Sequence, residues 1–167
     1  MNWVDQPPLP FHHGNCLLTG EPLSAWTQLH VQYLQTGAIR SARDPRFVLR
    51  TFLVPKKDVG YRLVVDLRHL NSHCRPWHTR FETLGALIPQ IRQGMFFIGW
   101  DIRDAFHHLR VEAKATRYFA FQINGETFEC PGLCFGWLNS PPTFTKLMRP
   151  LVAFICAPCV ARCVSQK

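Results

Sequence analysis

Residues 54–71 read V-P-K-K-D-V-G-Y-R-L-V-V-D-L-R-H-L-N, and the chain around them can be interpreted outward from this stretch. Residues 47–54 form a β-type run that Pro55 closes, and residues 61–67 form a second run of the same type. The short basic segment 56–60 lies between them, so the pattern predicts a β-hairpin over residues 47–67. An ordinary exposed basic hairpin is one interpretation of this stretch. The other is a phosphate-binding flap, in which Lys56 and Lys57 act as point charges and Arg62 as a fork.

Helices and strands are both expected in the rest of the chain. Helical spacing predicts helices over residues 23–36, ended by Gly37, and over residues 82–92, where Pro89 weakens the pattern. Asn124-Gly125 between two β-type runs predicts a second hairpin over residues 118–130. Ser140 as N-cap and Pro141 at the first helical position predict a further helix. Its apolar face would comprise Phe144, Leu147, Met148, Leu151 and Ile155. Because these elements do not alternate as βαβ units, the fold class is α+β.

The segment F-F-I-G-W-D-I-R-D-A-F, residues 96–106, places two carboxylates after an apolar run. The run predicts a buried strand over residues 96–102 that delivers Asp101 at its end, with a turn through Asp104 behind it. Mg²⁺ takes oxygen ligands and often only one or two protein carboxylates together with substrate phosphates. The alternative is that Asp101 and Asp104 cap the following turn, because Asp favours caps. In the third feature, C-P-G-L-C-F-G-W-L-N-S-P-P-T-F-T-K over residues 130–146, Gly136 would let a ligand approach the backbone closely.

Charge is distributed unevenly along the 167 residues, whose formal net charge is +8. No Lys or Arg precedes Arg40, whereas residues 40–110 carry 13 basic and 6 acidic side chains. Such a stretch is typical of a partner rich in phosphate, such as nucleic acid, although a solvated basic surface would have the same composition. No apolar stretch is long enough to span a bilayer, and the N-terminus lacks the features of a signal peptide. An intracellular protein, in cytoplasm or nucleus, is therefore expected.

Seven cysteines offer a further hypothesis, a small zinc protein. The tail has Cys156, Cys159 and Cys163, and Cys130 and Cys134 could add sulfur. His69, His73, Cys74 and His78 could form a second cluster. A lone C-x2-C without a matching pair is weak support for a zinc site, and reduced thiols are the default in this compartment.

The three features and their spacing resemble the reverse transcriptase family, namely its fingers and the first half of its palm. The resemblance covers about residues 33–155 and is closest to retrotransposon enzymes of the DIRS-like, tyrosine-recombinase class. It rests on four motifs in order: F-L-V-P-K-K-D with Y-R-L-V-V-D-L-R-H-L-N, R-F-E-T-L, W-D-I-R-D-A-F-H-H-L and F-G-W-L-N-S-P-P-T-F-T-K-L-M. A right-hand polymerase fold, with an incomplete antiparallel palm sheet packed on helices, is what the resemblance implies. Residues 1–32 are expected to be an irregular lead-in, and residues 156–167 a tail unlike the family.

The resemblance also implies roles for single residues. Asp101 would bind the catalytic Mg²⁺ or Mn²⁺ ions, helped by the carbonyl of Ile102. Asp104 and Ala105 would receive the triphosphate, and Phe106 would be the aromatic gate against a ribose 2′-hydroxyl. Arg62 with Lys56 or Lys57 would grip the phosphates, and Phe135 and Gly136 would lie beside the nucleotide, although the family often has Gln where Phe135 stands. The implied partners are deoxynucleoside triphosphates and an RNA or DNA template with its primer.

One departure from the family concerns its third palm motif, an aromatic residue followed by any residue and then Asp-Asp. No Asp or Glu follows Glu129 in this sequence, and neither a thumb nor an RNase H segment is recognisable. We expect a truncated copy that binds metal weakly and does not polymerise alone, because two divalent ions need more carboxylates than Asp101 and Asp104. The main alternative is a non-catalytic nucleic-acid-binding remnant that uses the same basic hairpin.

Overall fold

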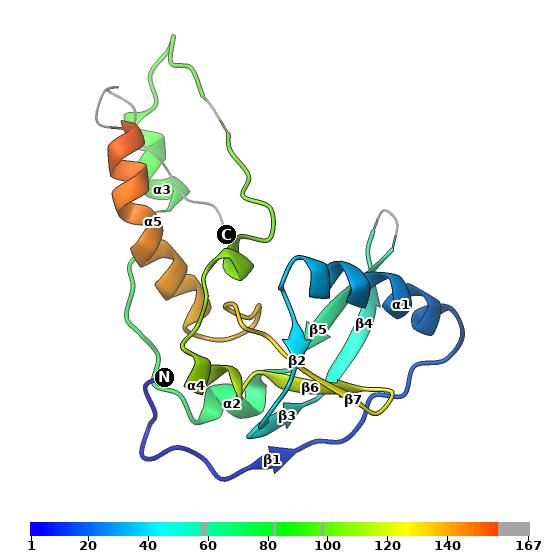
Figure 1. Cartoon of the computed structure of the whole chain (residues 1–167). Coiled ribbons are helices and arrows are strands. Elements are labelled where there is room, and N and C mark those ends of the chain that lie inside the picture. The colour runs from blue at the N-terminus through cyan, green and yellow to red at the C-terminus, as the bar shows by residue number, and fades with distance from the viewer. Residues whose placement is uncertain (58–59, 82, 98, 157–167) are drawn as a thin grey trace.

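The structure is a computed structural model that describes residues 1–57, 60–81, 83–97 and 99–156. It contains the predicted first hairpin, formed by β4 (Thr51–Pro55) and β5 (Tyr61–Val65) (Figure 1). The two strands pair antiparallel, with Val54 opposite Arg62. The backbone N–H of Lys56 donates to the Gly60 carbonyl at 2.9 Å, so this hydrogen bond continues the pairing beyond the two strands. Residues 58–59 lie outside the described part.

A second, five-stranded sheet lies below the hairpin in Figure 1 and has the order β1-β3-β6-β7-β2. Its strands are β1 (Phe11–His12), β2 (Arg40–Ser41), β3 (Phe47–Leu49), β6 (Ala120–Ile123) and β7 (Glu126–Glu129). Pairing is antiparallel for β6–β7 and β7–β2 and parallel for β1–β3 and β3–β6. The β-type run predicted over residues 47–54 therefore splits at Arg50, so that β3 and β4 belong to different sheets.

The hairpin predicted around Asn124-Gly125 is confirmed. Both residues have positive φ, 48° and 85°, as the tight turn between β6 and β7 requires. Phe121 and Ile123 of β6 and Phe128 of β7 lie in the core. The largest fully buried apolar side chains of this core are Phe47, Leu49, Leu70, Phe119, Phe121 and Ile123. The predicted strands and helices thus pack around one apolar core, which lies between the sheet and the helices. The α+β class is therefore confirmed.

Helix α1 (Gly20–Gln35) packs on this core through Trp26. The indole lies edge-on to Phe121 and Phe128, with ring centroids 6.3 and 5.7 Å apart. The chain leaves the helix through Gly37, whose φ of 67° is left-handed, so the predicted stop at this glycine is confirmed. The helix begins earlier than predicted, at Gly20 rather than at residue 23.

Residues 1–32, expected to be irregular, include β1 and most of α1. The N–H of Phe11 donates to the Arg46 carbonyl at 2.9 Å, and that of Cys16 donates to the Gln122 carbonyl at 3.0 Å. Further along, the Asn15 side chain accepts from the N–H of Gly125 at 3.0 Å. The extended segment is held because its backbone groups pair with strands that come much later in the sequence.

Of the remaining helices, α5 (Ser140–Cys156) and α3 (Leu84–Leu87) stand apart from the two sheets, whereas α2 (Arg68–Ser72) packs on the core through Leu70. α5 rises beside α3 and the short helix η1 (Ile88–Gln90), as Figure 1 shows. The predicted helix over residues 82–92 is therefore confined to two short pieces, with Pro89 inside the second. Smaller elements complete the chain: α2 (Arg68–Ser72), η2 (Ala105–His108) and α4 (Ala113–Thr116). None of the helices in the described part is long and apolar enough to cross a membrane.

Two local predictions are wrong. Ser140 is the first helical residue and not the N-cap. Its hydroxyl points back to the preceding loop, where it donates to the Cys134 carbonyl at 2.7 Å. The buried strand predicted over residues 96–102 is absent from its described residues, which run without regular structure. Phe96 is 98% exposed and Trp100 is 69% exposed. An apolar run becomes a strand only when another strand satisfies its N–H and C=O groups, and no described strand lies beside this one.

Candidate functional site

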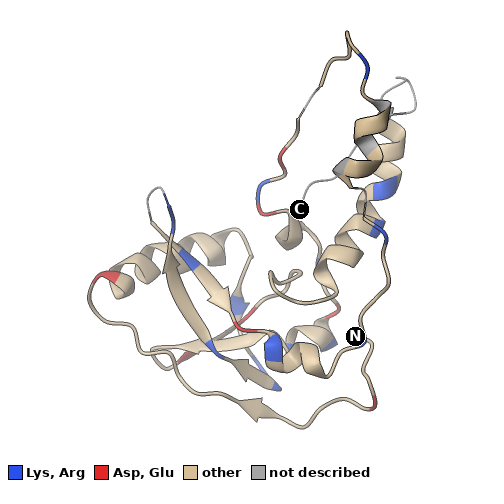
Figure 2. Ribbon diagram, turned by 180° about the vertical axis from the view of Figure 1, so that it is seen from behind, with Lys and Arg blue, Asp and Glu red and all other residues tan. Residues whose placement is uncertain are grey.

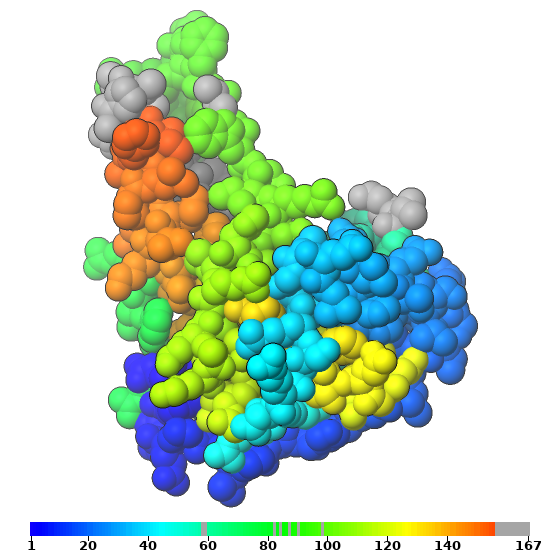
Figure 3. Space-filling view, viewed as in Figure 1, coloured from blue at the N-terminus to red at the C-terminus, as the bar shows by residue number. Residues whose placement is uncertain are grey.

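Asp101 and Asp104 lie on the segment that crosses between α5 and α1, coloured green in Figure 3. The side chain of Asp101 is exposed and lies on an irregular segment, not at the end of a strand as predicted. Asp104 adopts a left-handed conformation with φ of 51°, and its carbonyl accepts from the N–H of His107 at 2.9 Å. Asp tolerates this conformation better than most residues, so Asp104 can turn the chain sharply into η2.

Aromatic contacts join η2 to the start of α5. The Phe106 ring lies 4.8 Å from the Phe135 ring and 5.5 Å from the Phe144 ring, measured between centroids. His107 meets Phe135 edge-on at 5.5 Å. Burial lowers the pKa of His107, and the nearby Asp104 carboxylate partly opposes that effect. The segments 96–106 and 130–146, whose contacting residues are about thirty positions apart in sequence, are thereby in direct contact.

A glycine that the sequence interpretation missed permits this contact. A Cβ built on Gly132 would lie 3.0 Å from the carbonyl oxygen of His107 and 3.1 Å from its Cα. Backbone atoms cannot move aside as a flexible side chain can. Any larger residue at position 132 would therefore push η2, and with it Phe106, away from the loop that carries Phe135.

Tyr33 of α1 links the β4–β5 hairpin electrostatically to Asp104. Burial is the main cause that raises the pKa of the Tyr33 phenol, and the negative charge of Asp104 raises it further. A hydrogen bond with the Leu63 backbone and the positive charge of Arg62 act in the opposite direction. Both charged groups therefore lie within electrostatic range of one hydroxyl. Helical spacing indicated only that Tyr33 belongs to the apolar face of a helix, so this role was not predicted.

The loop at Gly136 is held by α2, the helix that follows the same hairpin. Gly136 has a φ of 89°, and its carbonyl accepts from the Asn71 side chain at 2.8 Å. The Asn71 side chain also accepts from the N–H of Leu138 at 3.0 Å. A Cβ on Gly136 would lie 3.8 Å from the Leu67 side chain. The left-handed backbone explains the glycine, because a Cβ there would make only ordinary contacts. The double hydrogen bond of Asn71 is a positioning feature that only the structure reveals.

The structure brings Phe106, which follows Asp104, into contact with Phe135, with Gly136 at the border of this region. Arg62 and Asp104 both act electrostatically on the Tyr33 phenol. Lys56 and Lys57 are exposed near the tip of the hairpin, where Lys and Arg positions recur along the ribbon in Figure 2. No contact joins them, Asp101 or Ile102 to that region within the part of the chain that is described. Ala105 is placed there by its neighbours Asp104 and Phe106.

Nowhere in the described ranges do three or more His, Cys, Asp or Glu side chains gather in a way that could hold a metal ion. The carboxylates of Asp101 and Asp104 therefore do not complete a centre for Mg²⁺ or Mn²⁺ by themselves. For zinc, burial is the main cause that raises the pKa of Cys134, which favours the protonated thiol that does not bind metal. Cys159 and Cys163, on which the zinc hypothesis also depends, lie outside the described residues.

Comparisons with known proteins identify the family of this chain. A family model described as "Reverse transcriptase (RNA-dependent DNA polymerase)" matches residues 54–161. The chain is 31% identical over 145 residues to the Gag-Pro-Pol polyprotein of Simian retrovirus SRV-2, which covers 83% of this chain and 7% of the polyprotein. It is 27% identical over 130 residues to the Pol polyprotein from transposon 297 of Drosophila melanogaster, covering 72% of this chain and 12% of that protein.

The fold is shared with a solved structure. The native prototype foamy virus protease-reverse transcriptase is similar with a TM-score of 0.75 at 19% identity, over 92% of this chain and 21% of that one. A foamy viral protease-reverse transcriptase solved in complex with double-stranded DNA gives a TM-score of 0.70 at 20% identity, over 92% of this chain and 26% of that one. This chain therefore spans a small part of the proteins it resembles. Because the family match extends over more than half of its length, and a retroviral relative is more than 30% identical to it, the chain belongs to the reverse transcriptase family.

Proposed function

We propose that residues 33–155 are the fingers and the first part of the palm of a retroelement RNA-directed DNA polymerase. The observation that supports this most is the contact of Phe106, which follows Asp104, with Phe135 of a separate sequence motif. A guanidinium and a sharply turned backbone are suited to a triphosphate, and an aromatic pair is suited to the sugar beside it. Lys56 or Lys57 would reach the same phosphates from the hairpin tip.

Within that site, each residue has a proposed role in nucleotide binding. Phe106 would exclude a ribose 2′-hydroxyl, with Phe135 holding its ring from the other loop. Backbone groups of Asp104 and Ala105 would receive the triphosphate, and Gly136 would allow close approach. Asp101, with the Ile102 carbonyl, would supply one carboxylate to a pair of divalent ions, Mg²⁺ or Mn²⁺. The other carboxylates would have to come from a part of the polymerase other than the described residues.

We further propose that this chain alone does not polymerise. No Asp or Glu follows Glu129, and a two-ion nucleotidyl transfer needs carboxylates on both sides of the ions. The exposed position of Asp101, away from any described strand, supports the same conclusion, because a carboxylate that no neighbouring strand holds in place is poorly preorganised for metal binding. A truncated retrotransposon copy of the DIRS-like class would account for these features. A tyrosine-recombinase reading frame in the same element would support that source, and its absence would count against it.

Photo-cross-linking tests the nucleotide site. The purified chain would be irradiated with a deoxynucleoside triphosphate that carries a photoreactive base, with Mn²⁺, and the adducts mapped by mass spectrometry. We expect adducts in residues 101–108 or 133–137, reduced by Arg62→Gln and unchanged by Arg43→Gln. Adducts spread evenly over the surface, with no effect of Arg62→Gln, would contradict the proposal.

Primer extension tests the second part of the proposal. We expect no template-dependent extension from the chain alone with Mg²⁺ or Mn²⁺. Extension that disappears in Asp101→Asn would show that inactivity is wrong and that the polymerase assignment is right. A non-catalytic nucleic-acid-binding remnant is the alternative, and the exposed, unpaired Asp101 segment favours it. A steep fall of nucleic-acid affinity with salt, with no specific cross-link near Phe106, would support that alternative.

A further inference from the structure

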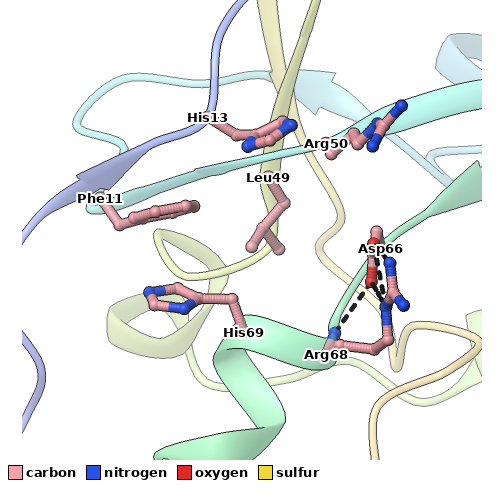
Figure 4. A pocket seen from close by; sticks show the side chains of 7 residues that line it. All are labelled: Phe11, His13, Leu49, Arg50, Asp66, Arg68 and His69. Atoms are coloured by element: carbon pink, nitrogen blue, oxygen red, sulfur yellow. Dashed lines mark hydrogen bonds and ion pairs between the residues drawn. The ribbon is translucent and has the colours of Figure 1, made fainter.

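A hollow of about 330 Å³ lies where β1 meets the start of α2 (Figure 4). Its rings cover one another, because the Phe11 ring lies 4.0 Å from that of His69 and 6.3 Å from that of His13. On the other side, Arg68 holds the Asp66 carboxylate through contacts of 2.6 to 3.1 Å. Contacts within the chain therefore already use most of the rings and charges that line this hollow.

Apolar side chains without such contacts lie at the end of the molecule away from the sheets, on the segment between η1 and Asp101 (Figures 1 and 3). Four of them are exposed: Met95, Phe96, Phe97 and Trp100. The backbone N–H and C=O groups of residues 96, 97 and 99–102 form no hydrogen bond with the described part of the chain. The 95–102 segment thus has the composition of a strand and open backbone groups, but its partner strand is missing from the described residues.

One face of α5 enlarges this apolar surface. Leu147, Leu151 and Phe154 follow one another by four and three residues, so they lie on one side of the helix, and all three are exposed. With the four side chains of the 95–102 segment they expose on the order of 800 Å², at about 175 Å² for a fully exposed side chain of this size. The largest apolar patch of a typical monomer is about 300–600 Å², whereas each partner of a stable complex buries about 800 Å². The exposed area therefore matches what a second copy would cover.

The two ends of the same segment carry opposite charges. Arg92 precedes the exposed apolar side chains and Asp101 follows them, and neither forms an ion pair within the described ranges. If two copies of the segment pair antiparallel around its middle, Arg92 of each copy comes near Asp101 of the other. Parallel pairing would bring like charges together, which is unfavourable. A second copy is therefore complementary to the segment in charge as well as in backbone groups.

We propose that the chain forms a symmetric dimer, in which the 95–102 segments of two copies pair antiparallel and the exposed faces of α5 pack beside them. A two-fold axis through the middle of the segment gives each copy the strand partner that its own described residues do not supply. The dimer needs neither nucleotide nor metal, so it does not rest on the nucleotide site proposed above.

Sedimentation velocity of the full chain tests the association. We expect a single monomer–dimer equilibrium between about 0.5 and 50 μM, the range in which an interface of modest affinity dissociates. A monomer at every concentration would overturn the proposal. Open-ended oligomers would overturn it too, because a two-fold pairing closes at two copies. In a parallel run with phosphatidylcholine vesicles, binding of the monomer to lipid without any dimer would assign the surface to a membrane and would also overturn it.

Matched variants locate the interface. Phe97→Asp and Leu17→Asp each place a carboxylate where an exposed apolar side chain stood, but Leu17 lies on the N-terminal segment. We expect Phe97→Asp to weaken dimerisation at least about 10-fold and Leu17→Asp less than about 2-fold. Because both side chains are exposed, neither variant should shift the urea unfolding midpoint, which checks that both fold. Equal losses of dimerisation would overturn the proposal.

Charge reversal tests the antiparallel direction. Arg92→Glu and Asp101→Lys each set like charges side by side, and the two-fold axis repeats this at both ends, so each single variant should weaken dimerisation at least about 5-fold. The double variant restores opposite charges and should dimerise within about 2-fold of the wild type. A double variant as weak as the single variants would overturn the proposed pairing.

Hydrogen exchange measured by mass spectrometry reports on the segment itself. Amides of residues 96–102 should exchange at least about 10-fold more slowly above the Kd of dimerisation than below it, and Phe97→Asp should abolish this difference. Protection that does not depend on concentration would mean that another part of the same chain covers the segment. A dimer without protection there would mean that the copies pair elsewhere. Either result overturns the proposal. Nucleotide cross-linking near Phe106 is a separate measurement, so the two proposals fail separately.

Discussion

Replacing Arg40 with Ala should lower the free energy of unfolding, because it removes the ion-pair partner of a buried carboxylate where β2 pairs with β7. Arg40 lies opposite Glu129 in that register, and its Nε and Nη2 atoms both lie 2.7 Å from Glu129 Oε1. The Thr116 hydroxyl donates to the same oxygen at 3.1 Å. The Glu129 side chain is only 6% exposed, whereas that of Arg40 is 51% exposed. The variant therefore leaves a buried carboxylate with one hydroxyl as its remaining side-chain donor.

Breaking a fully buried ion pair from one side costs about 3–5 kcal/mol. Half of the Arg40 side chain already meets water, so solvent can partly replace it, and we expect a loss of roughly 2–3 kcal/mol. With a urea m-value of about 2 kcal/mol/M, the unfolding midpoint should fall by about 1–1.5 M. Circular dichroism during urea titration measures this shift, and Arg43→Ala serves as the matched control with an expected change below about 0.5 kcal/mol.

The double variant Arg40→Ala, Glu129→Gln tests the cause. It removes the uncompensated charge, so it should be about 1–2 kcal/mol more stable than Arg40→Ala alone. The reasoning would be refuted if Arg40→Ala cost no more than the Arg43→Ala control. It would also be refuted if the double variant were less stable than the single one, since the penalty would then not come from a buried charge.

Three further predictions follow from the packing and the charges. Gly132→Ala should cost about 1–3 kcal/mol in urea unfolding and reduce cross-linking near Phe106, because its Cβ meets the His107 backbone at 3.0 Å; unchanged values would count against that contact. Phe119→Ala should cost about 3–5 kcal/mol, because the ring is fully buried, and a loss below 1 kcal/mol would contradict the assigned core. The hydrogen bond from Arg68 lowers the pKa of Asp66 to about 2 from 3.8, so its stabilising contribution is present above about pH 4 and disappears as pH falls toward 2. Wild type and Asp66→Asn should therefore converge in free energy of unfolding over that range, and parallel pH profiles would contradict the pair.

The outcome for individual elements shows which signals in the sequence are local. The hairpin at Asn124-Gly125 and the helix stop at Gly37 were predicted because left-handed backbone strongly restricts the residues that can occupy it. The β4–β5 hairpin was predicted from two β-type runs around a short turn. By contrast, residues 96–102 have the composition of a buried strand but lie exposed, because a strand needs a partner that composition does not supply. The split of residues 47–54 at Arg50 was likewise invisible, since both halves are β-type.

The residues of the candidate functional site also fall into two groups, those that the sequence could nominate and those that only the structure revealed. Arg62, Asp104, Phe106 and Phe135 could be nominated from the sequence because they lie in motifs that resemble those of the reverse transcriptase family. Contributions from Tyr33, Asn71 and Gly132 were not predicted, since their importance arises from contacts with segments 30 or more residues away or from the closeness of another backbone. The hollow beside Phe11 was missed for the same reason, because the N-terminal segment had no recognisable pattern.

By itself, the sequence determined the kinds of local structure, the family and the chemical character of the proposed nucleotide-binding residues, because those depend on residue type and short spacing. Only the tertiary structure decided which strands are paired, where Asp101 lies, and that the first residues of the chain form one wall of a pocket. These features depend on which distant segments come into contact, and such contacts are set by the packing of the whole core.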